Sequence, residues 1–235
     1  MNFNNRLNLE KAYSEVKTYV LSSGFRDEIE WQAGISFNDV TESYFLREGA
    51  WVILNSGMKE SVIRKYFQEL SLCFFEWESA HKINESKAFC YEAAIDIFNN
   101  DRKISAIIDM SVRICNLGFN NLKECIESAP IEFLQTFKHI GPVTSYHQAK
   151  KLGLQIAKPD RHLVRLSNFL GFKDVQELCS TISEDSGDAI AVVDVVLWRF
   201  ATLRQDYLDT FFSYAKLTYH ENSLFSLQES YRGAV

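Results

Sequence analysis

The amino-acid sequence predicts an all-α protein, and three observations lead to this prediction. Apolar residues recur with the 3.6-residue period of a helix along most of the 235 residues. The three Pro and ten Gly occur singly, so they separate helices without forming long loops. No segment shows the apolar–polar alternation that is typical of a half-buried β-strand.

Helix follows helix along the chain, with short turns between them. The first has an apolar stripe of Ala12, Val16, Tyr19 and Val20, and residues 26–41 after it are predicted to be irregular. The helix at residues 188–205 is almost entirely apolar, which indicates that it is buried. The predicted helices cover residues 8–25, 42–55, 59–79, 85–99, 101–119, 120–129, 130–137, 144–151, 161–172, 174–183, 188–205 and 206–220.

Capping residues set several helix boundaries. Thr41 and Asn121 are predicted N-caps, because their side chains can accept a hydrogen bond from an N–H group of the first turn. Pro130 suits the first position of a helix. Gly118 and Gly171 are predicted to end the helices that precede them.

The composition is that of a globular protein of a reducing compartment. Hydrophobic residues make up 46% of the chain, enough for a packed core. We expect no membrane span, since no apolar run is long enough, and no export, since "MNFNNRLNLEKAYSEV" lacks the apolar core of a signal peptide. The five cysteines are an odd number without CxxC spacing, which indicates reduced thiols, a cytoplasmic location and neither a metal site nor an iron–sulfur cluster.

Charge is unevenly distributed along the chain. The net charge of −6 counts against a polyanionic partner. Between residues 137 and 165, however, a single acid, Asp160, stands among six basic residues. These are Lys138, Lys150, Lys151, Lys158, Arg161 and Arg165. A basic face on an acidic body is compatible with DNA binding, and an ordinary solvated run of charges is the alternative.

Within this basic stretch, residues 134–151 have the pattern of two helices joined by a hairpin turn, "HIGP". Gly141 is predicted to supply a positive φ or a close backbone approach, and Pro142 to open the second helix. The first turn of that helix has backbone N–H groups without helical partners. Such a terminus favours an anion, and a phosphate is the obvious candidate.

Asp160 follows the hairpin within "KPDRHLVR" and is the first residue of an Asp-x-His-x-x-Arg pattern. The hairpin "FKHIGPVT" and this acid together resemble the helix-hairpin-helix (HhH-GPD) DNA glycosylases. In that superfamily the hairpin reads L-x-G-[IV]-G-x-x-[TS], and an aspartate follows in a V-D-x-H-x-x-R context. The segments "AWVILNSGM", "CNLGFNNLKECI" and "VVDVVLWRFA" are also similar to segments of these enzymes, so the resemblance covers roughly residues 44–215.

The resemblance implies a two-lobed helical fold with a cleft between the lobes. Residues 41–215 would form the glycosylase core with its hairpin at 134–151, residues 1–40 an extension packed on that core, and residues 216–235 a tail. The implied partner is double-stranded DNA, from which a monomeric enzyme flips and excises a base. A monovalent cation held by hairpin carbonyls is implied, and the chemistry requires no other cofactor.

The resemblance also assigns roles to individual residues. The Asp160 carboxylate would stabilise positive charge on the deoxyribose and orient the attacking water. The DNA-binding residues would be Lys138, His139, Gly141, Val143, Thr144, Lys150, Lys151, Arg161 and Arg165, with both Lys150 and Lys151 facing solvent. The residues of the base pocket or of the loop that fills the gap would be Tyr44, Trp51, Asn55 and Met58.

Three departures from the superfamily pattern shape the expected activity. His139 replaces the first glycine of the hairpin. Val143 stands where the bifunctional members have a catalytic lysine, so no Schiff base can form there and a monofunctional enzyme is expected. The iron–sulfur cysteines of endonuclease III are missing.

Several of these residues have a structural alternative. Asp160 can serve as the N-cap of the helix at 161–172, a role that is compatible with catalysis. His162 can be a buried, hydrogen-bonded histidine instead of a general base. Trp51 and Met58 can be ordinary core residues.

Three functions therefore stay open at this point. The first is a monofunctional DNA N-glycosylase that removes an alkylated base in DNA repair, or a hypermodified phage base such as glucosylated hydroxymethylcytosine in antiviral defence. The second is a non-catalytic helix-hairpin-helix module that binds DNA, and the third is a helical protein that binds a partner protein through its acidic body. Asp160 favours the first, because a pure DNA binder has no use for an acid facing the phosphate backbone.

Overall fold

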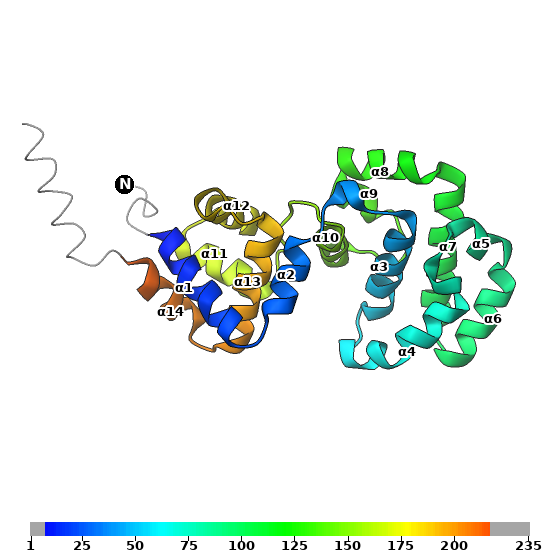
Figure 1. Cartoon of the computed structure of the whole chain (residues 1–235), viewed down its shortest axis with the longest axis horizontal. Helices are drawn as coiled ribbons and strands as arrows, with labels where there is room; N and C mark the ends of the chain where they lie inside the picture. The colour runs from blue at the N-terminus through cyan, green and yellow to red at the C-terminus, as the bar shows by residue number, and fades with distance from the viewer. Residues whose placement is uncertain (1–7, 217–235) are drawn as a thin grey trace, which may run out of the picture. The chain divides into compact units, whose positions relative to one another are not determined.

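The computed structural model describes residues 8–216 and confirms the all-α class. These residues form fourteen α-helices and two short 3₁₀-helices, and no β-strand is found among them. Contacts between the helices divide the described chain into two compact units (Figure 1). Unit 1 contains residues 8–34 and 157–216, and unit 2 contains residues 35–156.

Unit 1 is built around one apolar helix, α13 (Ile190–Leu203), as its composition predicts. The other helices of the unit all pack against it, and Figure 1 shows the blue α1 beside the orange α13. They are α1 (Leu9–Ser22), α2 (Arg26–Ala33), α11 (Arg161–Leu170), α12 (Val175–Ser186) and α14 (Tyr207–Ala215). The two ends of the described chain thus share one core.

The prediction that residues 26–41 are irregular is wrong. Arg26–Ala33 forms α2, and Phe37–Asp39 forms the 3₁₀-helix η2. The polar sequence of α2 has too little apolar periodicity to reveal a helix. In the structure α2 packs on α13, and the Arg199 Nε donates to a Glu28 carboxylate oxygen at 2.8 Å. Tertiary contacts therefore stabilise a helix that its own sequence does not specify.

Unit 2 surrounds α3 (Glu42–Asn55) and α7 (Asp101–Leu117), which pack against each other. The bounds of α3 match the prediction, and Thr41 caps it, since its Oγ1 accepts the Tyr44 N–H at 3.2 Å. The remaining elements of the unit are α4 (Glu60–Cys73), η3 (Phe75–Trp77), α5 (Ala80–Glu85), α6 (Lys87–Ile97), α8 (Phe119–Ser128), α9 (Pro130–Leu134) and α10 (Pro142–Lys151).

The long helix predicted at residues 59–79 is shorter in the structure. It ends at Cys73, and the three residues Phe75–Trp77 then have φ values between 52° and 64°. This left-handed conformation is unfavourable for residues with a Cβ atom. It turns Trp77 into the core, where the ring is 1% exposed and its Nε1–H donates to Ser71 Oγ at 2.9 Å. Burial of the indole offsets the strain of the turn.

Two other details differ from the sequence prediction. Asn121 is not an N-cap, because α8 begins directly after Gly118, and the Asn121 side chain donates to the Leu117 carbonyl from inside the helix at 2.8 Å. The short helix α5 was not predicted. Pro130 opens α9 and Gly171 ends α11 in a left-handed conformation, as expected.

The described part of the segment 1–40 supplies α1 and α2 to unit 1, where both pack on α13. Apart from Lys216, the predicted tail at residues 216–235 lies outside the described residues, as does the end of the helix predicted at 206–220. No helix in the described part of the chain is both long and apolar enough to cross a membrane.

Gly153 tolerates a side chain poorly, and this gives a test of the packing of unit 2. Its φ is +78°, and a Cβ atom would lie 2.8 Å from the carbonyl oxygen of Ile35. Gly57 has a φ of +70° with no atom within 4 Å of the same position. We expect Gly153→Ala to lower the free energy of unfolding by about 3 kcal/mol and Gly57→Ala by about 1 kcal/mol in urea denaturation. Equal losses would contradict the close approach at Ile35.

Candidate functional site

The predicted hairpin is present, but its left-handed residue is His139 and not Gly141. α9 ends at Leu134, three residues before the predicted end at residue 137, whereas α10 begins at Pro142, as the sequence predicts. His139 has a φ of 63°, whereas Gly141 is extended, with φ −96° and ψ −171°. A Cβ atom on Gly141 would meet nothing nearer than Thr144 Oγ1 at 4.0 Å. The predictions of a positive φ and of a close approach at Gly141 are therefore wrong.

His139 occupies the position at which the resemblance places a glycine. Glycine is favoured in a left-handed conformation, and histidine is among the other residues that adopt it more often than most. Desolvation, together with the positive charges of Lys103 and Arg102, lowers the pKa of the exposed His139. The departure from the glycine pattern thus keeps the turn and adds an imidazole to it.

The first turn of α10 has two backbone N–H groups without an acceptor in the described chain, those of Val143 and Thr144, whereas its neighbours are satisfied. The Gly141 N–H donates to Thr144 Oγ1 at 2.7 Å, and the Ser145 N–H donates to the Gly141 carbonyl at 2.9 Å. No residue of the described chain accepts a hydrogen bond from the N–H groups of Val143 and Thr144. With the partial positive charge of a helix N-terminus, these two groups suit an anion such as a phosphate.

An open groove of about 560 Å³ runs along the hairpin. Its lining residues are Ser56, Gln135, Phe137, His139, Ile140, Gly141, Pro142, Val143 and Thr144. Ser56 follows α3 directly, in the turn that the resemblance assigns to filling the gap in DNA. Two segments far apart in the sequence therefore meet at one groove within unit 2.

Lys103 anchors the turn after α3, and the sequence analysis missed it. Its side chain is buried, and its Nζ donates to the carbonyls of Leu54 and Ser56, the latter at 2.8 Å. Burial lowers the pKa of Lys103. A signal for this role exists in the sequence, because Lys103 stands one helical turn before the buried Ile107 and hence on the apolar face of α7.

Asn55 and Met58, the predicted gap-filling residues, have different environments. The Asn55 Nδ2 donates to the Trp51 carbonyl at 3.0 Å, while its Oδ1 is buried without a partner in the described part of the chain. The Met58 N–H donates to the Asn55 carbonyl at 3.0 Å, and its side chain is exposed. Met58 is therefore not a core residue, and its thioether is available for contact with a ligand.

Tyr44 and Trp51 extend from α3 toward neighbouring helices of unit 2. The Tyr44 hydroxyl donates to the Lys151 carbonyl at 3.0 Å, and burial is the main reason that the Tyr44 pKa rises to about 12. The Trp51 ring meets Phe67 edge-on at 4.9 Å, and the Arg64 guanidinium lies 5.4 Å from the indole centroid. Both rings contribute to helix packing, and their role in a base pocket stays a prediction.

The expectation that Lys151 faces solvent is wrong. Its Nζ lies 2.6 Å from Glu48 Oε2, and the two side chains are only 15% and 3% exposed. Lys150 is half-buried. Lys138, in contrast, pairs with Asp109 at 2.7 Å, and both of these side chains are exposed. Of the predicted phosphate-binding lysines, Lys138 is thus the accessible one beside the hairpin.

Asp160 lies in unit 1, where it caps α11 as predicted. Its Oδ1 accepts the His162 N–H at 2.8 Å, and its own N–H donates to the Lys158 carbonyl at 2.7 Å. The residue is half-buried. The cap uses one carboxylate oxygen, so a second oxygen is left for other chemistry.

The helix that follows Asp160 has a basic outer face. Arg161 and Arg165 are exposed, whereas Leu163 and Leu166 are buried in the core of unit 1. The Arg161 Nε donates to His162 Nε2 at 3.3 Å. An exposed arginine pair suits backbone phosphates, which accept hydrogen bonds from guanidinium groups.

Tyr207, which the sequence analysis missed, joins the residues around the cap. Its ring meets the His162 imidazole edge-on at 5.7 Å, and its hydroxyl donates to the His162 carbonyl at 3.3 Å. Burial raises the Tyr207 pKa, Arg165 opposes this rise and the charge of Asp160 adds to it. The His162 Nδ1 is buried and has no partner among residues 8–216. His162 is therefore only partly satisfied as a structural histidine.

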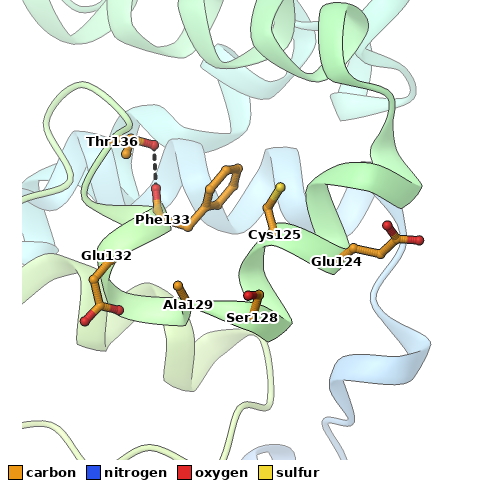
Figure 2. A pocket seen from close by; sticks show the side chains of 7 residues that line it. All are labelled: Glu124, Cys125, Ser128, Ala129, Glu132, Phe133 and Thr136. Carbon is orange, nitrogen blue, oxygen red and sulfur yellow. Dashed lines mark hydrogen bonds between the residues drawn. The ribbon is translucent and has the colours of Figure 1, made fainter.

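A second groove, of about 490 Å³, lies at α8 and α9 (Figure 2). Figure 2 shows the Phe133 ring and the Cys125 thiol side by side, while the carboxylates of Glu124 and Glu132 point away from them. The remaining lining residues are Ser128, Ala129 and Thr136. Because both carboxylates point away from Cys125, this groove brings neither an acid nor a base to the thiol.

Comparisons with protein-family models, with curated proteins and with solved structures give no match for this chain. No group of three His, Cys, Asp or Glu side chains within residues 8–216 could hold a metal ion. All five cysteines are free thiols.

The buried Lys151–Glu48 pair and the exposed Lys138–Asp109 pair allow a direct comparison. Lys151→Met leaves the Glu48 carboxylate buried with less compensation, so we expect a loss of about 3 kcal/mol in the free energy of unfolding. Lys138→Met should change that free energy by less than about 0.5 kcal/mol. Chemical denaturation of both variants measures the difference. An unaltered stability of Lys151→Met would show that the Glu48 contact is not part of the folded state.

Proposed function

We propose that this protein is a monofunctional DNA N-glycosylase with the two-lobed fold of the helix-hairpin-helix superfamily. It flips a damaged or modified base out of double-stranded DNA and hydrolyses the N-glycosidic bond, which leaves an abasic site. The observation that carries the proposal is the setting of Asp160. A half-buried carboxylate stands at the N-terminus of a helix with exposed arginines, and its cap occupies only one of its oxygens.

The chemistry needs a fixed negative charge near the sugar. Positive charge builds on the deoxyribose as the base departs, and a carboxylate about 4 Å away stabilises it by roughly 4 kcal/mol at an effective dielectric near 20. That stabilisation corresponds to a rate increase of about a thousandfold. Asp160 supplies the charge and orients or deprotonates the attacking water from its position at the N-terminus of α11.

DNA binding is assigned to the hairpin and to the exposed cations. The Val143 and Thr144 N–H groups bind one phosphate, and Lys138, Arg161 and Arg165 bind others. Met58, on the turn that shares the hairpin groove, fills the space left by the flipped nucleotide. Val143 cannot form a Schiff base, so strand cleavage by a lyase step is not expected.

Two classes of base fit the proposal. One is an alkylated base, removed in DNA repair, and the other is a hypermodified phage base such as glucosylated hydroxymethylcytosine, removed in defence. We place the protein in the cytoplasm, because its five free thiols suit a reducing compartment, and we take the monomer as the working unit.

A non-catalytic DNA-binding module is the second candidate. The cap that Asp160 forms with the His162 N–H is a specific observation in its favour, since this hydrogen bond explains an acid at the position without any catalysis. The unsatisfied hairpin N–H groups would then account for the function by phosphate binding alone.

Asp174 provides a matched control for the test of Asp160. It caps α12 in the same unit, and its Oδ1 accepts the Glu177 N–H at 2.8 Å. Asparagine caps a helix about as well as aspartate does, so neither Asp160→Asn nor Asp174→Asn should lose much stability. A purely structural role therefore predicts the same behaviour for both variants.

The experiment measures abasic sites, by alkaline cleavage, in methylated, deaminated, oxidised and phage-modified DNA. We expect wild type and Asp174→Asn to produce abasic sites in one substrate, and Asp160→Asn to be slower by about a thousandfold with unchanged DNA affinity. The substrate that responds identifies the base. DNA binding without abasic sites in any substrate would contradict the glycosylase and support the binding module.

A further inference from the structure

A second acid, Asp194, stands in the middle of the apolar helix α13. Its flanking residues Val192, Val193, Val195 and Val196 are all buried, and Asp194 itself is 1% exposed. Removing a carboxylate from water costs free energy that only hydrogen bonds or opposite charges offset. A valine would fit the pattern of this helix at no such cost, so the acid calls for a specific explanation.

The contact that Asp194 makes lies on the segment leading to Asp160. The Lys158 N–H donates to Asp194 Oδ2 at 2.6 Å, across 36 residues of sequence. The preceding N–H, that of Ala157, donates to the Gln176 side-chain oxygen at 2.8 Å. Two consecutive backbone amides are therefore held by side chains of α13 and α12, at the point where the chain joins unit 1.

Few degrees of freedom remain between this anchor and Asp160. Pro159 has its φ fixed by its ring and has no N–H. The Asp160 N–H donates back to the Lys158 carbonyl at 2.7 Å, and the Asp160 side chain is bonded to the His162 N–H. The position of the Asp160 carboxylate is therefore set through a short chain of hydrogen bonds that starts at Asp194.

We propose that Asp194, assisted by Gln176, is a positioning residue that holds the Lys158–Asp160 segment so that the Asp160 carboxylate is fixed before substrate binds. This inference rests on the proposed function of Asp160. Asp194 touches neither the base nor the sugar, and it acts through the Lys158 backbone. A charge that is fixed in advance stabilises a developing cation without reorganisation during the reaction, which is why rigid support of Asp160 matters for rate.

Three variants separate positioning from general stability. Asp194→Asn keeps a side-chain oxygen that can accept the Lys158 N–H, whereas Asp194→Val fills the space without an acceptor. Gln176→Ala removes the acceptor of the neighbouring Ala157 N–H. Because Gln176 is half-buried, this variant can test the positioning even if Asp194→Val fails to fold. Each is compared with wild type in hydrogen exchange, DNA affinity and single-turnover base release.

Hydrogen exchange tests the positioning without any need for activity. We expect the Lys158 amide to exchange at least about tenfold faster in Asp194→Val and to remain protected in Asp194→Asn. The Lys11 amide, which donates to the Asn8 side chain at the cap of α1, serves as the internal control and should not change. Unchanged protection of the Lys158 amide in Asp194→Val, or of the Ala157 amide in Gln176→Ala should Asp194→Val not fold, would overturn the inference.

Base release tests the consequence for the reaction. We expect a fall of about 10- to 100-fold in the single-turnover rate for Asp194→Val, with the DNA dissociation constant unchanged and Asp194→Asn within a few fold of wild type. Gln176→Ala should also lower the single-turnover rate, by a smaller factor than Asp194→Val does. A normal rate in Asp194→Val despite loss of Lys158 protection would also overturn the inference. Absence of base release in wild type would be a failure of the proposed function instead, and exchange would still decide whether Asp194 holds the segment.

Discussion

The hydrogen bond from the Lys158 amide to the buried Asp194 is the contact on which the candidate catalytic site depends. It fixes the chain where it joins unit 1, two residues before Asp160. The start of α11 and hence the capping carboxylate follow from that anchor. A buried carboxyl group is an expensive way to hold a loop when stability is the sole requirement. Its use here indicates that the position of the loop matters more than the lost free energy.

In unit 2, too, a buried polar side chain holds a backbone segment, here through donation to carbonyl groups. Lys103 is buried in α7, and its ammonium holds the carbonyls at the end of α3, beside the hairpin. The turn that contains Met58 is thereby fixed next to the two unsatisfied N–H groups of α10. In each unit a buried polar side chain secures a backbone segment that the proposed reaction would use. The cores supply rigidity, and these two side chains specify where the loops lie.

The sequence predicts the parts of this arrangement that arise from local interactions. The apolar period and the Thr41 cap give the bounds of α3, and the Asp160 cap follows from its place before a helix. What the sequence could not predict depends on tertiary contacts. The polar helix α2 exists because it packs on α13. Lys151 looks like a surface lysine until Glu48 is found beside it. The left-handed conformation at His139 is set by the hairpin as a whole, because local preference alone would have placed it at Gly141.

Hydrolysis of an N-glycosidic bond with the help of Asp160 is tested most directly by mass detection of the small molecules released when the protein acts on substrate DNA. We expect wild type to release a free, intact base in an amount equal to the abasic sites formed, and Asp160→Asn to do so about a thousandfold more slowly. Release of a nucleotide, or equal release of base by Asp160→Asn and wild type, would show that Asp160 does not promote this hydrolysis.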